Sequence, residues 1–155
     1  MNLALFDFDG TITNDDSFIR FIRFTKGNFK YLSGILVLSP ILIAYKIKLI
    51  PNYKAKKIMF SFFFKGMKEY HFLRLAEDYS LNHLDDIIRI KAKEKIDWHK
   101  KQCDKVVVVS ASIEDWLRPW CEKNNLDVIG TKIEIKDGLV SGNFLTKNCY
   151  GIEKV

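Results

Sequence analysis

The chain has 155 residues, of which 48% are hydrophobic and 28% charged, a composition that allows a packed interior and excludes wholesale disorder. This length fits one domain, or a small core that carries an insertion. The formal charge of +6 favours anionic partners, which include phosphate compounds, nucleic acid and acidic lipid surfaces. Charge alone does not choose among them.

The cysteines and the N-terminal segment indicate a compartment. Cys103, Cys121 and Cys149 are odd in number and have no C-x-x-C spacing, which disfavours a disulfide framework and a zinc site. Asp7 and Asp9 lie where a secretory signal needs an uninterrupted apolar run. We therefore expect a cytoplasmic protein.

The first apolar segment, residues 3–8, has hydrophobic side chains at nearly every position, which is typical of a strand buried on both faces of a parallel sheet. Asp7 lies near the end of this segment, and Asp9, Gly10 and Thr11 follow it directly. Because Asp7 and Asp9 alternate along an extended segment, their carboxylates start on the same face. Gly10 permits a tight turn, and Thr11 offers a hydroxyl and an amide to an anion. Paired carboxylates suit a nucleophile with a general acid, a Mg²⁺ site, or both; the alternative is a strand end that happens to be acidic.

The most hydrophobic part follows a helix that we expect to begin near Ser17. Residues 31–50 are apolar but are interrupted by Pro40, Lys46 and Lys48, so we expect two short helices or one kinked helix rather than a membrane span. A second apolar block at 58–64 completes an apolar hairpin with a basic tip. Its residues 32–64 form either the buried seam of a small helical domain or a surface for peripheral membrane contact.

The second half of the chain alternates helices with strands. Residues 67–102 have a mostly helical pattern, and residues 105–110 form a valine-rich strand that ends at Ser110. We expect Ser112 to cap the next helix, and residues 127–130 to form a third strand. The alternation over 133–144 around Asp137 and Gly138 predicts a hairpin.

Three segments together resemble the haloacid dehalogenase superfamily of phosphatases. The loop from Asp7 to Thr11 resembles the first motif of that superfamily. Ser110, which follows a hydrophobic strand, resembles the second motif, and Lys154 within Gly-Ile-Glu-Lys-Val resembles the third. The resemblance implies an α/β fold: a Rossmann-like core with a parallel sheet over residues 1–13 and 103–155, and an inserted α-helical cap over residues 14–102. The hairpin at 133–144 would belong to the core.

The resemblance also implies roles. Asp7 would be the nucleophile that forms an aspartyl-phosphate, and Asp9 the general acid and base. The Asp7 carboxylate and the Asp9 backbone carbonyl would bind Mg²⁺. The residues implied in phosphate binding are Thr11, Ser110, Ala111 and Lys154.

The sequence departs from the family pattern after Lys154. The fourth motif, an acidic loop that completes the Mg²⁺ site, would lie beyond Val155. We therefore expect a core that is incomplete at its C-terminal side, a first strand left as an open apolar edge, and a truncated piece of a longer enzyme. The turnover of these 155 residues alone is left open.

The hydrophobic cap is similar to that of the phosphoserine-phosphatase-like branch, subfamily IB, and in particular to phosphatidylglycerophosphate phosphatases. That resemblance implies a lipid phosphate as substrate, at the inner face of the membrane. The alternatives are a soluble phosphomonoester such as phosphoserine, or an inactive fragment that binds membranes or anions. No nucleic-acid-binding module is evident, so no nucleic acid partner is expected.

Overall fold

The computed structural model describes residues 2–146, and a three-stranded parallel sheet forms its centre. The strands are β1 (Leu3–Asp7), β2 (Lys105–Ile113) and β3 (Asp127–Thr131), in the spatial order β1-β2-β3. Ala4 lies opposite Val106, and Val108 lies opposite Val128. The expected α/β fold with a parallel sheet is confirmed, and β2 continues three residues beyond its predicted end.

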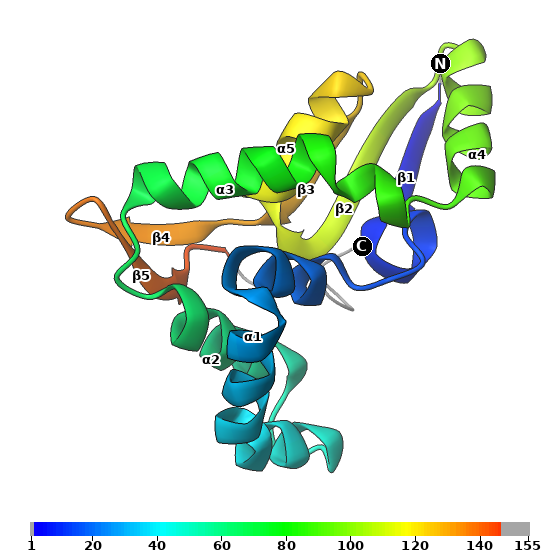
Figure 1. The fold of residues 1–155 in the computed structure, drawn as a ribbon. Coiled ribbons are helices and arrows are strands. Elements are labelled where there is room, and N and C mark those ends of the chain that lie inside the picture. Colours follow the sequence, from blue (N-terminus) through cyan, green and yellow to red (C-terminus); the bar gives the residue numbers. More distant parts are fainter. Residues whose placement is uncertain (1, 147–155) are drawn as a thin grey trace.

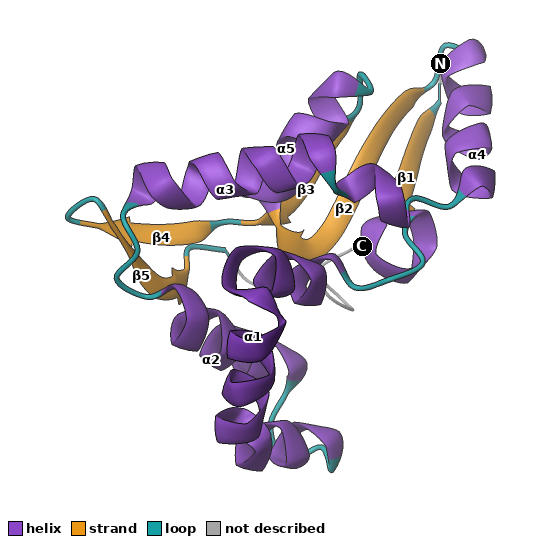
Figure 2. Cartoon of the chain, viewed as in Figure 1, coloured by secondary structure: helices purple, strands orange, loops and turns teal. Residues whose placement is uncertain are grey.

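Helices surround this sheet and extend well beyond it (Figures 1 and 2). They are α1 (Ser17–Lys46), α2 (Asn52–Phe64), α3 (Glu69–Asn82), α4 (Ile90–Lys101) and α5 (Glu114–Lys123), with short turns η1 (Phe8–Ile12) and η2 (Leu84–Ile87). Helix α3 packs on α5, and α4 packs on β2, whereas α1 and α2 project away from the sheet (Figure 1). The assignment of residues 14–102 to a cap stays a prediction.

The predicted hairpin is present. Strands β4 (Ile133–Lys136) and β5 (Leu139–Phe144) pair antiparallel, and Asp137 and Gly138 form the turn between them. Helix α2 packs against β5, so the β4–β5 hairpin supports α2.

An aromatic cluster ties the base of α1 and α2 to the body. Phe21 stacks on Trp116 with ring centroids 4.4 Å apart, and it contacts Phe64 and Phe72 at 5.3 and 5.7 Å. These four side chains come from α1, α5, α2 and α3, and all are almost completely buried. Burial of large aromatic side chains is among the strongest contributions to core stability, so the base of both projecting helices is firmly anchored.

The change of direction in α1 falls at Gly27 and not at Pro40, where the sequence pattern placed the break. Gly27 has φ 76° and ψ 163°, a conformation open to glycine but strained for other residues. Pro40 lies within the helix and is exposed, and Leu36, whose carbonyl loses its helical partner, is exposed as well.

Strand β1 lies at one edge of the sheet, as expected. It pairs with β2 on one side, and among residues 2–146 no strand pairs with its other side. Leu3 and Leu5, which alternate onto the same face of the sheet, are 61% and 55% exposed, so the prediction of a strand buried on both faces was wrong. This face of β1 is apolar but accessible because, at the sheet edge, the strand is covered only on its other face.

Candidate active site

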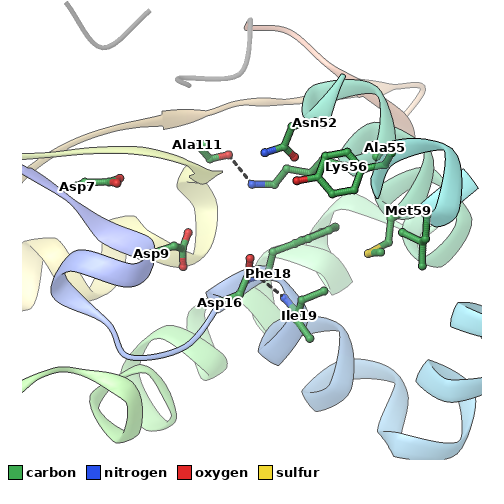
Figure 3. Close-up of a pocket in the computed structure, with 12 residues that line it drawn as sticks. Asp7, Asp9, Asp16, Phe18, Ile19, Asn52, Ala55, Lys56, Met59 and Ala111 are labelled. Atoms are coloured by element: carbon green, nitrogen blue, oxygen red, sulfur yellow. Dashed lines mark hydrogen bonds between the residues drawn. The ribbon is translucent and has the colours of Figure 1, made fainter. Parts of the chain in front are cut away.

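A cavity of about 300 Å³ lies between the C-terminal end of the sheet and the helices α1 and α2 (Figure 3). In parallel α/β sheets this end of the strands is where ligands bind. The sheet side of the cavity supplies Asp7, Asp9 and Ala111. The helical side supplies Asp16, Phe18, Ile19, Leu42, Tyr45, Asn52, Ala55, Lys56 and Met59.

Asp7 ends strand β1, and the chain turns sharply after it. The Asp7 carboxylate accepts a hydrogen bond from the amide of Phe8 at 2.9 Å. Gly10, with φ 79°, makes the turn, and the Thr13 hydroxyl accepts a hydrogen bond from the Gly10 amide at 3.2 Å. The amide of Thr13 donates to the carbonyl of Phe8 at 3.0 Å, which closes the loop that places Asp9.

Asp9 is held through both carboxylate oxygens. Oδ1 accepts from the Ser17 amide at 2.7 Å, and Oδ2 accepts from the Ser112 hydroxyl at 2.5 Å. The hydroxyls of Ser17 and Ser112 lie 3.0 Å apart, and Trp116 Nε1 donates to Ser17 Oγ at 3.4 Å. Because Ser17 and Ser112 are fully buried, the Asp9 carboxylate has a fixed position at the cavity wall.

A second carboxylate lies close by. Asp16 caps α1, and its Oδ1 accepts from the amides of Phe18 and Ile19 at 2.9 and 3.0 Å. Although the residue reaches solvent, the protein crowded around its carboxyl group and the neighbouring charge of Asp9 raise the pKa of Asp16. The cavity therefore gathers carboxyl groups where the end of the sheet meets the start of α1.

Lys56 brings a cation from α2 into this acidic cavity. Its Nζ donates to the Ala111 carbonyl at 2.7 Å and lies 5.4 Å from the centre of the Phe18 ring (Figure 3). The Ala111 carbonyl also accepts from the Thr131 hydroxyl at 2.9 Å. This contact joins α2 to the end of β2 across the cavity.

The structure brings some of the predicted site residues together. Asp7, Asp9 and Ala111 share the cavity wall, whereas Thr11 and Ser110 do not line the cavity. Thr11 is exposed in η1, and Ser110 is buried with its hydroxyl accepting from the Ser112 amide at 3.0 Å. Lys154 lies outside the described residues.

The prediction for Ser112 was wrong. Ile113, not Ser112, precedes the first turn of α5, and no side chain caps that helix. Strand β2 runs on through Ser112 to Ile113, which pairs with Thr131, so the Ser112 side chain turns to Asp9 instead. Sequence reasoning also missed Lys56 as a cavity residue, because nothing in a run of lysines marks the one that faces inward.

The donor set fits a magnesium ion in part. Within residues 2–146 no group of three or more His, Cys, Asp and Glu side chains is placed to hold a metal. Mg²⁺ commonly binds one or two protein oxygens and fills its remaining positions with water and substrate phosphate. Both oxygens of Asp9 already accept hydrogen bonds, so the protein donors that fit are the Asp7 carboxylate and the Asp9 backbone carbonyl.

Two carboxylates at the end of the first strand of an open α/β sheet lie where ligands of such sheets bind. Residues 4–155 match the haloacid dehalogenase-like hydrolase family. The chain is also 30% identical over 155 residues to Protein CicA of Caulobacter vibrioides, covering 99% of this chain and 69% of that protein. The chain therefore belongs to the haloacid dehalogenase-like hydrolases, a family whose enzymes typically use Mg²⁺.

Solved structures share this fold. A Bordetella pertussis Tohama I protein of unknown function has a TM-score of 0.76 at 18% identity, covering 92% of this chain and 66% of that one. A phosphoserine phosphatase, solved as an analogue of its phospho-aspartyl intermediate, has a TM-score of 0.61 at 20% identity, covering 92% of this chain and 62% of that one. The chain thus spans a little under two thirds of these two structures.

Proposed function

We propose that the chain carries the nucleophile and the general acid of a phosphomonoester hydrolase that acts through an aspartyl-phosphate intermediate. The observation that carries this proposal is the pairing of Asp7 and Asp9 at one cavity, with Asp9 fixed by Ser17 and Ser112. A general acid needs a fixed position relative to the leaving group, and the two bonds to Asp9 provide it.

In the first step an oxygen of Asp7 forms a bond to phosphorus while the ester P–O bond breaks. Asp9 gives its proton to the departing oxygen, so the alcohol leaves neutral. In the second step Asp9, now ionised, takes a proton from a water molecule that attacks the phosphorus of the aspartyl-phosphate. Phosphate is released, and the carboxylate of Asp7 is regenerated.

The hydroxyl chain behind Asp9 suits both of its protonation states. When Asp9 is ionised, the Ser112 hydroxyl donates to it, as the structure shows. When Asp9 is protonated, it can donate to Ser112, whose hydroxyl then turns to Ser17 Oγ, 3.0 Å away. Serine hydroxyls donate and accept with equal ease, so the proton can be held and given up without moving the backbone.

Anionic phosphate needs cations near these carboxylates. Mg²⁺ held by the Asp7 carboxylate and the Asp9 carbonyl would offset the charge of the phosphate oxygens during attack. Among the described residues, Lys56 lines the same cavity from α2 and adds a positive charge opposite the carboxylates. Thr11, Ser110, Ala111 and Lys154 remain the proposed phosphate-binding residues.

The favoured substrate is a lipid phosphate such as phosphatidylglycerophosphate. The helical wall of the cavity is largely apolar, with Ile19, Leu42 and Met59 facing the space beyond the carboxylates. A substrate with an apolar body gains from this wall, whereas the ammonium and the carboxylate of phosphoserine gain nothing from it. A soluble phosphomonoester is the second candidate, since the fold is also that of a phosphoserine phosphatase.

The first test is release of phosphate from p-nitrophenyl phosphate with and without Mg²⁺. We expect Mg²⁺-dependent turnover that Asp7→Asn abolishes, while Asp97→Asn on the exposed face of α4 leaves the rate unchanged. Equal rates for the unmodified chain and Asp7→Asn would exclude Asp7 as nucleophile. No turnover in either favours an inactive, anion-binding fragment.

The second test compares a short-chain phosphatidylglycerophosphate with phosphoserine. We expect a higher kcat/KM for the lipid, and a selective loss of that advantage in Leu42→Ala, because Leu42 contributes to the apolar wall. A higher kcat/KM for phosphoserine contradicts the lipid assignment.

A further inference from the structure

Helix α1 carries an exposed apolar stripe after its bend at Gly27. Phe29, Leu32, Leu36 and Ile43, with Ile47 directly after the helix, recur at helical spacing toward the tip of the α1–α2 hairpin, defined as residues 28–64. Phe29 is 85% exposed and Leu36 is 75% exposed. Isolated exposed apolar side chains are ordinary, but a continuous stripe of this length indicates a surface that contacts another apolar phase.

The stripe is not a consequence of a loosely packed helix. On the inner face of the hairpin, Gly34 is buried, and a Cβ placed on it would lie 2.3 Å from Cζ of Phe63. Leu38 is also buried, and the base of the hairpin belongs to the aromatic core. The apolar residues thus divide into an inner set that packs and an outer set that stays exposed.

The hairpin and its surroundings are strongly basic. Between residues 17 and 68 the sequence has eleven Lys and Arg and no Asp or Glu, whereas the rest of the chain has more acidic than basic residues. Lys46, Lys48, Lys54 and Lys57 are all exposed near the tip. At an anionic membrane surface, the apolar side chains would contact the acyl chains and the flanking lysines would contact the charged headgroups.

The geometry argues against a membrane-spanning hairpin. By length and composition Ser17–Lys46 could cross a membrane, with 11% of its most apolar stretch buried. However, its first residues are in the core, and the returning helix α2 has 13 residues, about 20 Å, with Lys56 bonded at the cavity. A helix of that length cannot cross back.

Charge argues against a second copy of the chain as the occupant. A symmetric dimer through this stripe would place two basic segments side by side, each without an acidic residue, and like charges at an interface oppose association. An anionic lipid surface has the complementary charge.

We propose that the α1–α2 hairpin binds the surface of anionic lipid membranes, with its outer stripe at the acyl boundary and its lysines among the headgroups. The opposite side of the same hairpin supplies Leu42, Tyr45 and Asn52 to the cavity, so membrane binding places one wall of the site beside the lipid. Access of a lipid phosphate to the cavity rests on the proposed function, but vesicle binding does not.

The test is co-sedimentation of the 155-residue chain with phosphatidylcholine vesicles that contain phosphatidylglycerol, and with vesicles of phosphatidylcholine alone. We expect binding to the anionic vesicles, weakened by raised salt. Leu36→Gln/Ile43→Gln should weaken it at least about tenfold. Lys48→Glu/Lys54→Glu should weaken it to a similar extent.

Matched variants in α4 and β3, outside the α1–α2 hairpin, serve as controls. Ile90→Gln/Ile129→Gln changes exposed apolar residues, and Lys91→Glu/Lys101→Glu changes exposed lysines; both should bind as the unmodified chain does. Circular dichroism checks that each variant is folded. Asp7→Asn should bind vesicles normally, so loss of hydrolysis and loss of membrane binding are separate results.

Three results would overturn the proposal. The first is a folded chain that stays in the supernatant with anionic vesicles, or that binds equally well after the hairpin substitutions. The second is a dimer by light scattering that Leu36→Gln/Ile43→Gln dissociates, which would assign the stripe to a second copy. The third is retention in the membrane at alkaline pH, which would indicate a spanning helix.

Discussion

On the sheet side of the cavity, the carboxylate of Asp9 is fixed by the Ser17 amide and the Ser112 hydroxyl, and both serines are buried. On the hairpin side, the outer face of α1 is exposed, and residues 17–68 contain no acidic residue. On the sheet side, buried hydrogen bonds fix the position of the Asp9 carboxylate. On the hairpin side, exposed apolar and basic side chains are suited to contact with a partner. Substitutions in the two walls should therefore affect different measurements.

After the complete loss expected for Asp7→Asn, the largest effect belongs to Asp9→Asn. An asparagine can still accept from the Ser17 amide and bond to Ser112, so the fold should be retained, but it cannot transfer the proton. We expect turnover to fall by about 10²–10⁴-fold. The loss should be larger for an alkyl phosphate than for p-nitrophenyl phosphate, because a poor leaving group depends more on protonation.

Steady-state kinetics on the two substrates provides the measurement for Asp9. An identical loss on both would argue against Asp9 as the general acid and for a role in positioning alone.

Gly34→Ala tests the packing of the hairpin. The added methyl group meets the rings of Phe63 and Phe62 at 2.3 to 3.0 Å, and Phe63 is buried, so the two helices must separate. Overpacking of this kind costs about 1–3 kcal/mol, more than the helix propensity that alanine adds. Thermal unfolding should show a lower Tm, while the neighbouring exposed Ser33→Ala should leave it nearly unchanged. An unchanged Tm in Gly34→Ala would mean that the helices are not closely packed there.

Ser112→Ala probes the sheet side with a smaller change. It removes one of the two donors to Asp9, and we expect kcat to fall about tenfold, the effect of roughly one hydrogen bond to a charged group. Ser80→Ala is the matched control, because Ser80 is also buried and accepts from the Trp120 amide at 2.9 Å, away from the cavity. It should lower the Tm without lowering kcat. Equal kcat values for the two variants would remove Ser112 from the site.

The sequence was most informative where strand ends and chemistry coincide. The position of Asp7 and Asp9 at one cavity follows from an apolar run that ends in acids, and the β4–β5 turn follows from Asp137 and Gly138. These features depend on residues next to each other in the chain. The catalytic and phosphate-binding roles themselves stay predictions.

The features that sequence reasoning missed depend on distant residues. Ser112 bonds to a residue 103 positions away, and Lys56 to one 55 positions away, so no local pattern identifies either contact. The bend in α1 was placed at Pro40 because proline is the strongest helix breaker, but Gly27 bends the chain where the helix leaves the aromatic core. Tertiary packing decided each of these outcomes.

The smallest expected effect is the pH dependence of stability that comes from Asp85. The α1–α2 hairpin has no Asp or Glu, so this dependence arises in the rest of the molecule. Asp85 accepts hydrogen bonds from Trp120 Nε1 at 2.8 Å and from Lys123 at 3.3 Å. Burial opposes ionisation, but these bonds outweigh it and lower the pKa of Asp85. The stabilisation is therefore present above the ordinary carboxyl pKa and is lost as pH falls through the lowered value.

Asp85→Asn should reduce stability by less than about 1 kcal/mol near neutral pH, because Asp85 is half exposed and asparagine keeps the bond to Trp120. The difference in Tm between the two proteins should shrink as the pH is lowered below the ordinary range of a carboxyl group, where both side chains are neutral. Thermal unfolding over a pH series measures this. A difference that stays constant through the acid range would show that the charge of Asp85 contributes nothing to stability.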